Sequence, residues 1–252
     1  MNESLDRPID VAQLTAEQIQ SRLLHRDGLM LVIDKPAGLP VHRGPKGGPN
    51  LEASFDALRF GLPRPPVLAH RLDKDTSGCL VLGRHRKATA SLGLLFKHGK
   101  ISKTYWAVVE GGPAEDEGTI DMPLGRLNAE RGWWQKVDPD GQPAVTNWKV
   151  MGRGGGLTWL ALEPVTGRTH QLRVHTSAQG WPIVGDDIYG TQASLRRLHN
   201  EKFIPRFGEP RLHLHSREIG IPISKNKEPV RVVAPAPDHM RERLRACGWN
   251  GE

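Results

Sequence analysis

Residues 70–82 read His-Arg-Leu-Asp-Lys-Asp-Thr-Ser-Gly-Cys-Leu-Val-Leu, a charged stretch followed directly by an apolar run. The run from Cys79 to Leu82 predicts a buried strand, because aliphatic residues fill it and a glycine precedes it. A loop that leads into such a strand holds its side chains on a rigid scaffold and leaves them accessible, which suits catalysis. Alternatively, Asp73 or Asp75 caps a turn and Gly78 supplies a positive φ. The residues of this stretch alone leave both interpretations open.

The composition around this stretch predicts a soluble globular protein. The chain has 252 residues, of which 37% are hydrophobic, and a mean hydropathy of -0.48. This length suffices for one large domain or two closely joined subdomains. No apolar run approaches the roughly 18 residues of a membrane span, and the polar N-terminus does not resemble a signal peptide. We therefore expect a cytoplasmic protein with no membrane partner.

The charge balance favours a nucleic-acid partner. Lys and Arg total 35 against 28 Asp and Glu, which gives a formal charge of +7 and a sequence pI of about 9.6. Such a value is typical of nucleic-acid-binding proteins. The basic residues are dispersed, so a folded basic face is expected rather than a basic tail. The only two cysteines, Cys79 and Cys247, support neither a disulfide framework nor a cysteine zinc site.

The N-terminal part of the chain predicts short helices and one buried strand. After a loose leader, Thr15-Ala16-Glu17-Gln18 fits a capping box ahead of a helix with apolar positions at 19, 23 and 24. Residues 29–34 predict a strand that ends at the turn Lys35-Pro36-Ala37-Gly38. The glycine-rich loop 43–50 lacks the Walker spacing and ending, so no nucleotide cofactor is expected there. Further helices are predicted over 51–60 and 87–98.

The second half predicts alternating strands and two helices. Residues 101–111 alternate as a strand, residues 112–156 suggest strands and hairpins, and residues 157–162 form another strand. A helix is expected over 169–179 with Thr169 as N-cap, and another over 238–246. Trp133 and Trp134 either contact a nucleic acid or place at least one ring in the core.

The string His70-Arg71-Leu72-Asp73-Lys74-Asp75-Thr76-Ser77-Gly78 resembles the signature of the RluA family of RNA pseudouridine synthases. Three further stretches resemble the family's other motifs: residues 34–42, Lys103-Thr104-Tyr105 followed by Ala107, and residues 167–175 with their continuation to residue 190. The resemblance covers residues 28–235. It implies an α+β fold, with a mixed, mostly antiparallel sheet in two subdomains, flanking helices and a central cleft. Residues 1–27 would then form a leader with a short helix, and residues 236–252 a basic extension.

The resemblance also implies roles for individual residues. Asp73 would be the catalytic carboxylate, Tyr105 would stack on the target uracil, and Arg173 would pair with Asp73. Arg71 would enter the RNA in place of an extruded base. Asp75 falls on a variable position of the motif and receives no catalytic role. The remaining residues expected to bind RNA are His70, Lys103, Arg168 and His170. The chain departs from the family pattern at Cys79, Gly83 and Ser216, none of which is a catalytic position.

The implied reaction is isomerisation of a specific uridine in structured RNA, a tRNA or a stem-loop of 23S rRNA. It requires no cofactor and no metal, and His170 and His175 lack the spacing of a zinc motif. We expect a monomer. Asp73 could act as a nucleophile toward the sugar or the base, or remove a ribose proton. Two other classes remain open: a glycoside or nucleoside hydrolase, which normally uses two facing carboxylates, and a noncatalytic RNA-binding or RNA-chaperone protein of the same fold.

Overall fold

A computed structural model describes residues 14–43, 47–127, 133–191, 211–224 and 226–251. The chain divides into two compact units, which are described separately. Unit 1 holds residues 1–102, 205–210 and 216–238, and unit 2 holds residues 103–204, 211–215 and 239–252. The predicted leader up to residue 13 and the centre of the glycine-rich loop, residues 44–46, lie outside the described residues.

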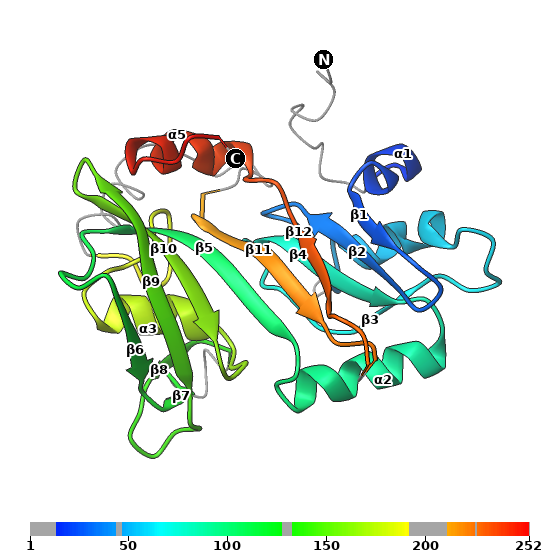
Figure 1. Cartoon of the computed structure of the whole chain (residues 1–252), viewed down its shortest axis with the longest axis horizontal. Coiled ribbons are helices and arrows are strands. Elements are labelled where there is room, and N and C mark those ends of the chain that lie inside the picture. Colours follow the sequence, from blue (N-terminus) through cyan, green and yellow to red (C-terminus); the bar gives the residue numbers. More distant parts are fainter. Residues whose placement is uncertain (1–13, 44–46, 128–132, 192–210, 225, 252) are drawn as a thin grey trace. The chain divides into compact units, whose positions relative to one another are not determined.

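The strands of unit 1 form an antiparallel group around β4 (Ser77–Gly83), in which every residue is buried. β4 pairs with β2 (Met30–Lys35) along its whole length, from Met30 opposite Gly83 to Lys35 opposite Gly78. β1 (Leu23–Arg26) lies beyond β2, as Figure 1 shows, and β3 (Val67–Leu68) pairs with the end of β4. On the other side, β4 neighbours β11 (Leu214–Ile221), which pairs with β12 (Val230–Val233). The buried strand predicted after the charged stretch is confirmed.

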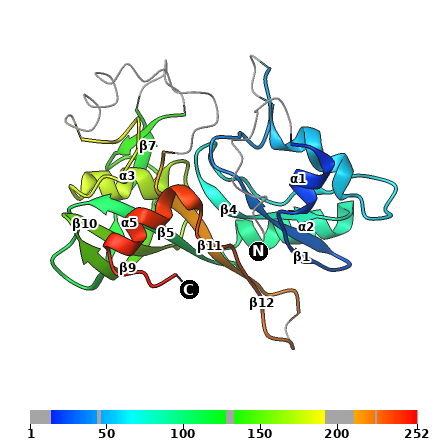
Figure 2. The ribbon, with the colours of Figure 1, turned by 90° about the horizontal axis from the view of Figure 1, so that it is seen from above.

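Among the described residues of unit 1 there are also three short helices. α2 (Arg86–Lys97) packs against β4, where Leu92 joins a core with Val32, Val81 and Ile219. α1 (Ala16–Gln20) lies beside the 3-10 helix η1 (Leu51–Leu58), as Figure 2 shows.

The predicted capping box is present, because Thr15 accepts a hydrogen bond from the Gln18 amide and the Gln18 side chain accepts one from the Thr15 amide. The helix prediction was wrong beyond Gln20, since Leu23 and Leu24 belong to β1. Their spacing fits a helix, but pairing with β2 satisfies the backbone there.

Unit 2 contains a second antiparallel group in the order β5, β10, β9 and β6. The bounds of these strands are Ser102–Glu110, Leu157–Pro164, Val145–Gly154 and Glu117–Asp121. A separate hairpin joins β7 (Leu124–Arg126) to β8 (Gln135–Val137). The strands predicted over 101–111 and 157–162 are therefore confirmed.

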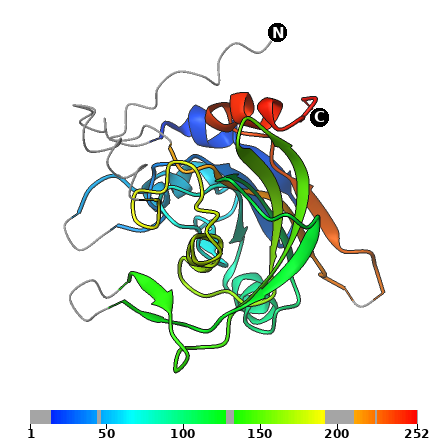
Figure 3. The same ribbon diagram turned by 90° about the vertical axis from the view of Figure 1, so that its left-hand side faces the viewer.

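Two helices cover opposite faces of this second group. α3 (Gln171–Ala178) lies on the inner side of the curved strands (Figure 3), where Leu172 packs with Leu160 and Leu162. The end of α5 (Asp238–Ala246) approaches β9 at Gly152 and Gly154, where a Cβ would lie 1.9 Å from the carbonyl oxygens of Cys247 and Ala246. Only glycine permits this close packing.

The N-cap predicted for α3 was wrong. Thr169 lies outside the helix, and the N-cap is His170, whose backbone is left-handed with φ of 52° and whose side chain does not cap the helix. A non-glycine residue in this conformation is uncommon and points to constraint from its neighbours.

Together the described elements form an α+β fold. The strand pairs β1–β2, β2–β4, β3–β4, β11–β12, β5–β10, β9–β10, β6–β9 and β7–β8 are all antiparallel. Among the described residues, no helix is both long and apolar enough to span a lipid bilayer.

Candidate functional site

Lys35 fixes the backbone of the loop that carries Asp73. Lys35 is fully buried, and its Nζ donates hydrogen bonds to the carbonyl oxygens of Pro36, Lys74 and Thr76 at 2.8, 2.8 and 2.9 Å. Two of these acceptors belong to the loop immediately after Asp73. Three hydrogen bonds use the whole donor capacity of an ammonium group. The lysine at the end of β2 therefore holds the loop in one conformation.

The surroundings of Lys35 act on its charge in opposite directions. Burial lowers the pKa of Lys35 to about 7, while the carboxylates of Asp75, Asp73 and Asp34 favour the protonated form. Burial likewise raises the pKa of Asp34 to about 6, against the effect of Arg22, whose Nη1 lies 3.8 Å from Asp34 Oδ2. The environment of Lys35 thus combines burial, which disfavours its charge, with three carboxylates that favour it.

The side chains of the loop itself differ in their exposure. Arg71 is exposed, whereas Asp73 and Asp75 are partly buried. His70 Nε2 accepts a hydrogen bond from the Val81 amide of β4 at 3.0 Å, and its ring stacks on Phe96 with centroids 4.3 Å apart. Because Nε2 is the acceptor, Nδ1 carries the ring proton of a neutral His70. His70 therefore anchors the loop to the core strand, in addition to its predicted contact with RNA.

In unit 2, Arg173 is held by a buried carboxylate. Its Nε and Nη2 donate to Asp186 Oδ2 and Oδ1, both at 2.7 Å, and Nη2 lies 3.4 Å from Asp187 Oδ1. The side chains of Arg173 and Asp186 are almost completely buried. Asp186 Oδ1 also accepts the amide hydrogens of Ile188 and Tyr189. This two-pronged pairing fixes the plane of the guanidinium.

Tyr189 connects Arg173 to His170 and to the β7–β8 hairpin. The Arg173 guanidinium lies 5.3 Å from the centroid of the Tyr189 ring. The Tyr189 hydroxyl accepts the Gln135 amide hydrogen at 2.9 Å and lies 2.9 Å from His170 Nδ1. These contacts account for the constrained backbone of His170, whose side chain is buried.

The two predicted residues of β5 lie on one face of the strand. Lys103 and Tyr105 are both partly buried, and Tyr105 is paired with Leu162 of β10. Burial lowers the pKa of Lys103. Arg168 is exposed, and its Nε donates to the Pro143 carbonyl.

The structure thus places the predicted residues in two groups. His70, Arg71 and Asp73 share one loop of unit 1, and His170 and Arg173 are linked through Tyr189 of unit 2. The predicted pair of Arg173 with Asp73 joins residues of different units and stays a prediction.

Sequence reasoning assigned no role to Lys35, Asp186 or Tyr189. A lysine before a proline is typical of a plain turn, and only the fold brings the carbonyls of residues 74 and 76 to its ammonium group. Asp186 stands 13 residues after Arg173, and only the fold brings its carboxylate to the guanidinium.

His175 is held by hydrogen-bonding partners within the protein. Its Nδ1 lies 2.9 Å from Thr146 Oγ1 and its Nε2 lies 3.0 Å from the Met122 carbonyl, so both ring nitrogens have protein partners. Within the described part of the chain, no group of three or more His, Cys, Asp or Glu side chains is arranged to hold a metal ion.

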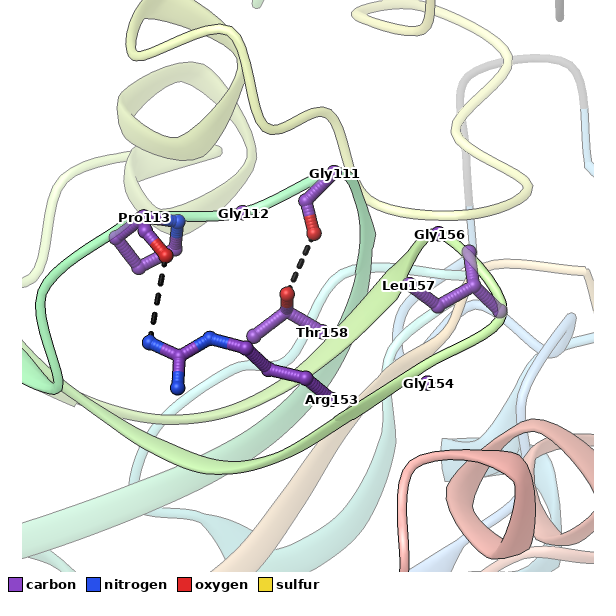
Figure 4. Close-up of a pocket in the computed structure, with 8 residues that line it drawn as sticks. All are labelled: Gly111, Gly112, Pro113, Arg153, Gly154, Gly156, Leu157 and Thr158. Atoms are coloured by element: carbon purple, nitrogen blue, oxygen red, sulfur yellow. Dashed lines mark hydrogen bonds between the residues drawn. The ribbon is translucent and has the colours of Figure 1, made fainter.

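A shallow pocket elsewhere in unit 2 contains none of the predicted site residues. It lies between the turns at Gly111 and Gly156, with Arg153 along its wall (Figure 4). The Arg153 guanidinium is already occupied by the Asp116 carboxylate and by backbone carbonyls at residues 113–115. The pocket therefore offers no free charged group.

Comparison with known proteins agrees with the motifs. The family model for RNA pseudouridylate synthase matches residues 29–178. The chain is 42% identical over 221 residues to an uncharacterized RNA pseudouridine synthase of Zymomonas mobilis. The matched region covers 87% of this chain and 95% of the relative. It is 32% identical to the ribosomal large subunit pseudouridine synthase C of Vibrio cholerae, over 90% of this chain and 69% of the relative.

Among solved structures, the human RNA pseudouridylate synthase domain containing 4 protein is similar, with a TM-score of 0.72 and 29% identity over 91% of this chain and 95% of the other. The chain therefore belongs to the RluA family of RNA pseudouridine synthases, isomerases that act on uridine in RNA.

Proposed function

We propose that this chain converts one specific uridine of a structured RNA into pseudouridine, with Asp73 as the catalytic carboxylate. The observation that carries the proposal is the geometry of the loop. A fully buried lysine donates to the carbonyls of residues 74 and 76, so the carboxylate just before them sits on a fixed backbone. A preorganised group loses little freedom when it reacts, which is how a single carboxylate becomes effective.

The chemistry requires no change of oxidation state. The bond between N1 of uracil and C1′ of the ribose breaks, the base turns, and C5 bonds to C1′. C5 loses its proton and N1 takes one up, so the product is an isomer of the substrate. Asp73 could attack C1′, attack the base, or remove a ribose proton, and all three roles need a carboxylate near the sugar. Asp75, whose carboxylate favours the protonated form of Lys35, has an electrostatic role in this proposal and no catalytic one.

Access to the uridine requires that the base leave its stack. The exposed Arg71 is suited to take its place, because a guanidinium stacks and also binds phosphate. Tyr105 offers a ring for the extruded uracil, and stacking offsets the cost of extrusion. Arg173, with its plane fixed by Asp186, would orient the Asp73 carboxylate. His70, Lys103 and Arg168 would contact the RNA around the site, whereas His170, predicted as a further contact, has a buried side chain and would position its neighbours.

The proposed substrates are 23S rRNA and tRNA. Support for ribosomal RNA comes from the name of the Vibrio cholerae relative, which is a ribosomal large subunit enzyme. The formal charge of +7 favours association with a polyanion. We further propose that residues 28–235 form the catalytic domain, that the protein acts as a monomer, and that it works in the cytoplasm, where these RNAs are found.

The test is pseudouridine mapping of total RNA from cells that lack the gene, complemented with wild type, Asp73→Asn or Asp75→Asn. A site that disappears and returns with wild type and Asp75→Asn, but not with Asp73→Asn, would support both the reaction and the role of Asp73. Restoration by Asp73→Asn would exclude that role. An unchanged map would instead favour the noncatalytic RNA-binding protein.

A further inference from the structure

The tip of the β7–β8 hairpin carries an exposed tryptophan that the proposed reaction does not use. Trp133 is 59% exposed, the largest exposed fraction among the exposed large hydrophobic residues of the described chain. Its neighbour Trp134 is partly buried. Of the two alternatives for this pair, Trp133 does not pack in the core, and neither ring is among the buried core residues of the described chain. Single exposed hydrophobic residues are common on protein surfaces, so the case for a ligand depends on what surrounds this ring.

The hairpin holds this ring in place. The Leu127 amide donates to the Trp134 carbonyl, and the Gln135 side chain donates to the carbonyls of Trp133 and Trp134. The backbone amide of Gln135 donates a hydrogen bond to the Tyr189 hydroxyl, whose oxygen also lies 2.9 Å from His170 Nδ1. β8 is therefore tied to the start of α3, the helix that carries Arg173.

The contacts of the Trp133 ring leave room for a stacking partner. Its centroid lies 5.5 Å from that of His170 and 5.9 Å from that of Trp134, with interplanar angles of 86° and 81°. Both neighbours are nearly perpendicular to the indole. Among the described residues, no aromatic ring stacks parallel to it. A ring held by two perpendicular neighbours and still 59% exposed is a good platform for a flat ligand, because little side-chain entropy remains to be lost.

The charges around the ring favour a polyanion. Three exposed basic residues lie on the elements that hold it: Arg126 opposite Gln135, Lys136 on β8, and Arg168 two residues before His170. One nearby carboxylate, Asp138, pairs with Lys136 at 3.3 Å. Indole faces beside arginine and lysine are the usual means of holding unpaired bases and their phosphates.

We infer that Trp133 is a stacking platform for an unpaired base of the RNA substrate. The base would lie outside the catalytic position, in a single-stranded part next to the target uridine. The inference rests on the proposed function for its ligand, and it adds a recognition residue that lies outside the family motifs. His170 then acts as a positioning residue for Trp133.

The direct test is binding of a fluorescein-labelled oligoadenylate 12-mer and of an RNA duplex of equal length. Trp133→Ala should weaken binding of the single strand about 5- to 100-fold and leave duplex binding unchanged. The slope of affinity against salt should not change, because no phosphate contact is removed. Met151→Ala, at another exposed apolar residue of unit 2, should bind as wild type does. Equal affinity of Trp133→Ala and wild type for the single strand would overturn the inference.

A second readout remains valid if Trp133→Ala disturbs the hairpin. Stacking of a base quenches indole fluorescence, and Trp106, Trp148, Trp159 and Trp249 are buried. Wild type should show quenching on binding the oligoadenylate, whereas Trp133→Phe should bind within a few-fold and show much less quenching. Equal quenching in both would contradict the platform. Because oligoadenylate contains no uridine, this result is independent of turnover, so an absence of pseudouridine in cells would refute the proposed function alone.

Discussion

Lys35 of unit 1 and Arg173 of unit 2 are both buried cations, and each organises a different kind of partner. Lys35 donates to three neutral carbonyls of the backbone, whereas Arg173 grips the carboxylate of Asp186 with two parallel hydrogen bonds. Carbonyls compensate a buried charge only partly, so burial lowers the pKa of Lys35 to about 7. An arginine does not lose its proton in proteins, and its carboxylate partner neutralises it.

The difference shows two ways to hold a charged group inside a protein. The lysine fixes the path of the loop that carries Asp73. The arginine is itself fixed in its plane by a carboxylate. The predictions that follow test whether the two cations are distinct in this way.

The largest effect is expected from removing the arginine. Arg173→Met leaves the Asp186 carboxylate buried without its cation, which should lower the free energy of unfolding by about 3–5 kcal/mol. The measurement is urea unfolding followed by circular dichroism. Adding Asp186→Leu should recover much of the loss, and Arg168→Met, at an exposed site, should cost less than about 0.5 kcal/mol. A single Arg173→Met variant as stable as wild type would show that the pair is not structurally important.

Replacing Lys35 should lower the free energy of unfolding less than replacing Arg173 does. Its main effect should be on turnover. Lys35→Met leaves three buried carbonyls without their donor, at a net cost of about 1–3 kcal/mol. It also releases the loop of Asp73, and misplacement of a reacting group by about 1 Å can lower the rate about 100-fold. Lys74→Met keeps the backbone carbonyl at that position and should retain activity. Full activity of Lys35→Met at a temperature where it is folded would contradict the clamp.

The dependence of stability on pH distinguishes the two cations. Burial lowers the pKa of Lys35 from the ordinary lysine value of 10.5, which applies to the unfolded chain, to about 7 in the folded protein. Between these two values the unfolded state binds more protons. The stability of wild type relative to Lys35→Met should therefore rise as the pH increases from about 7 to about 9, by at most about 1.4 kcal/mol per pH unit, and stay flat below about 7. Arg173→Met should show no such slope. A flat Lys35 difference would mean that the ammonium stays protonated throughout.

Local sequence patterns predicted the elements whose formation depends on residue type and spacing alone. The apolar run at β4 and the limits of α5 follow directly from residue type and periodicity. The helix at Ala16 was predicted too long, because pairing of Leu23 with Ile33 is a contact that spacing alone does not reveal. The left-handed His170 was not foreseen, since its conformation depends on Tyr189, nineteen residues later.

The same division holds for the candidate site. Asp73, Tyr105 and Arg173 followed from motif resemblance, and their catalytic roles stay predictions. Lys35 and Asp186 emerged only when the fold brought their partners to them, because buried charges are recognised by what surrounds them. Trp133 was noticed for its aromatic ring, and its exposure could not be read from the sequence.

The most direct test of the central claim uses purified protein and RNA from cells that lack the gene. Pseudouridine formed in a single turnover is measured by mass spectrometry for wild type, Asp73→Asn and the matched control Asp75→Asn. The account predicts modification of one site by wild type and Asp75→Asn and none by a folded Asp73→Asn. Formation of pseudouridine by Asp73→Asn at the wild-type rate would contradict the assignment of Asp73 as the catalytic carboxylate.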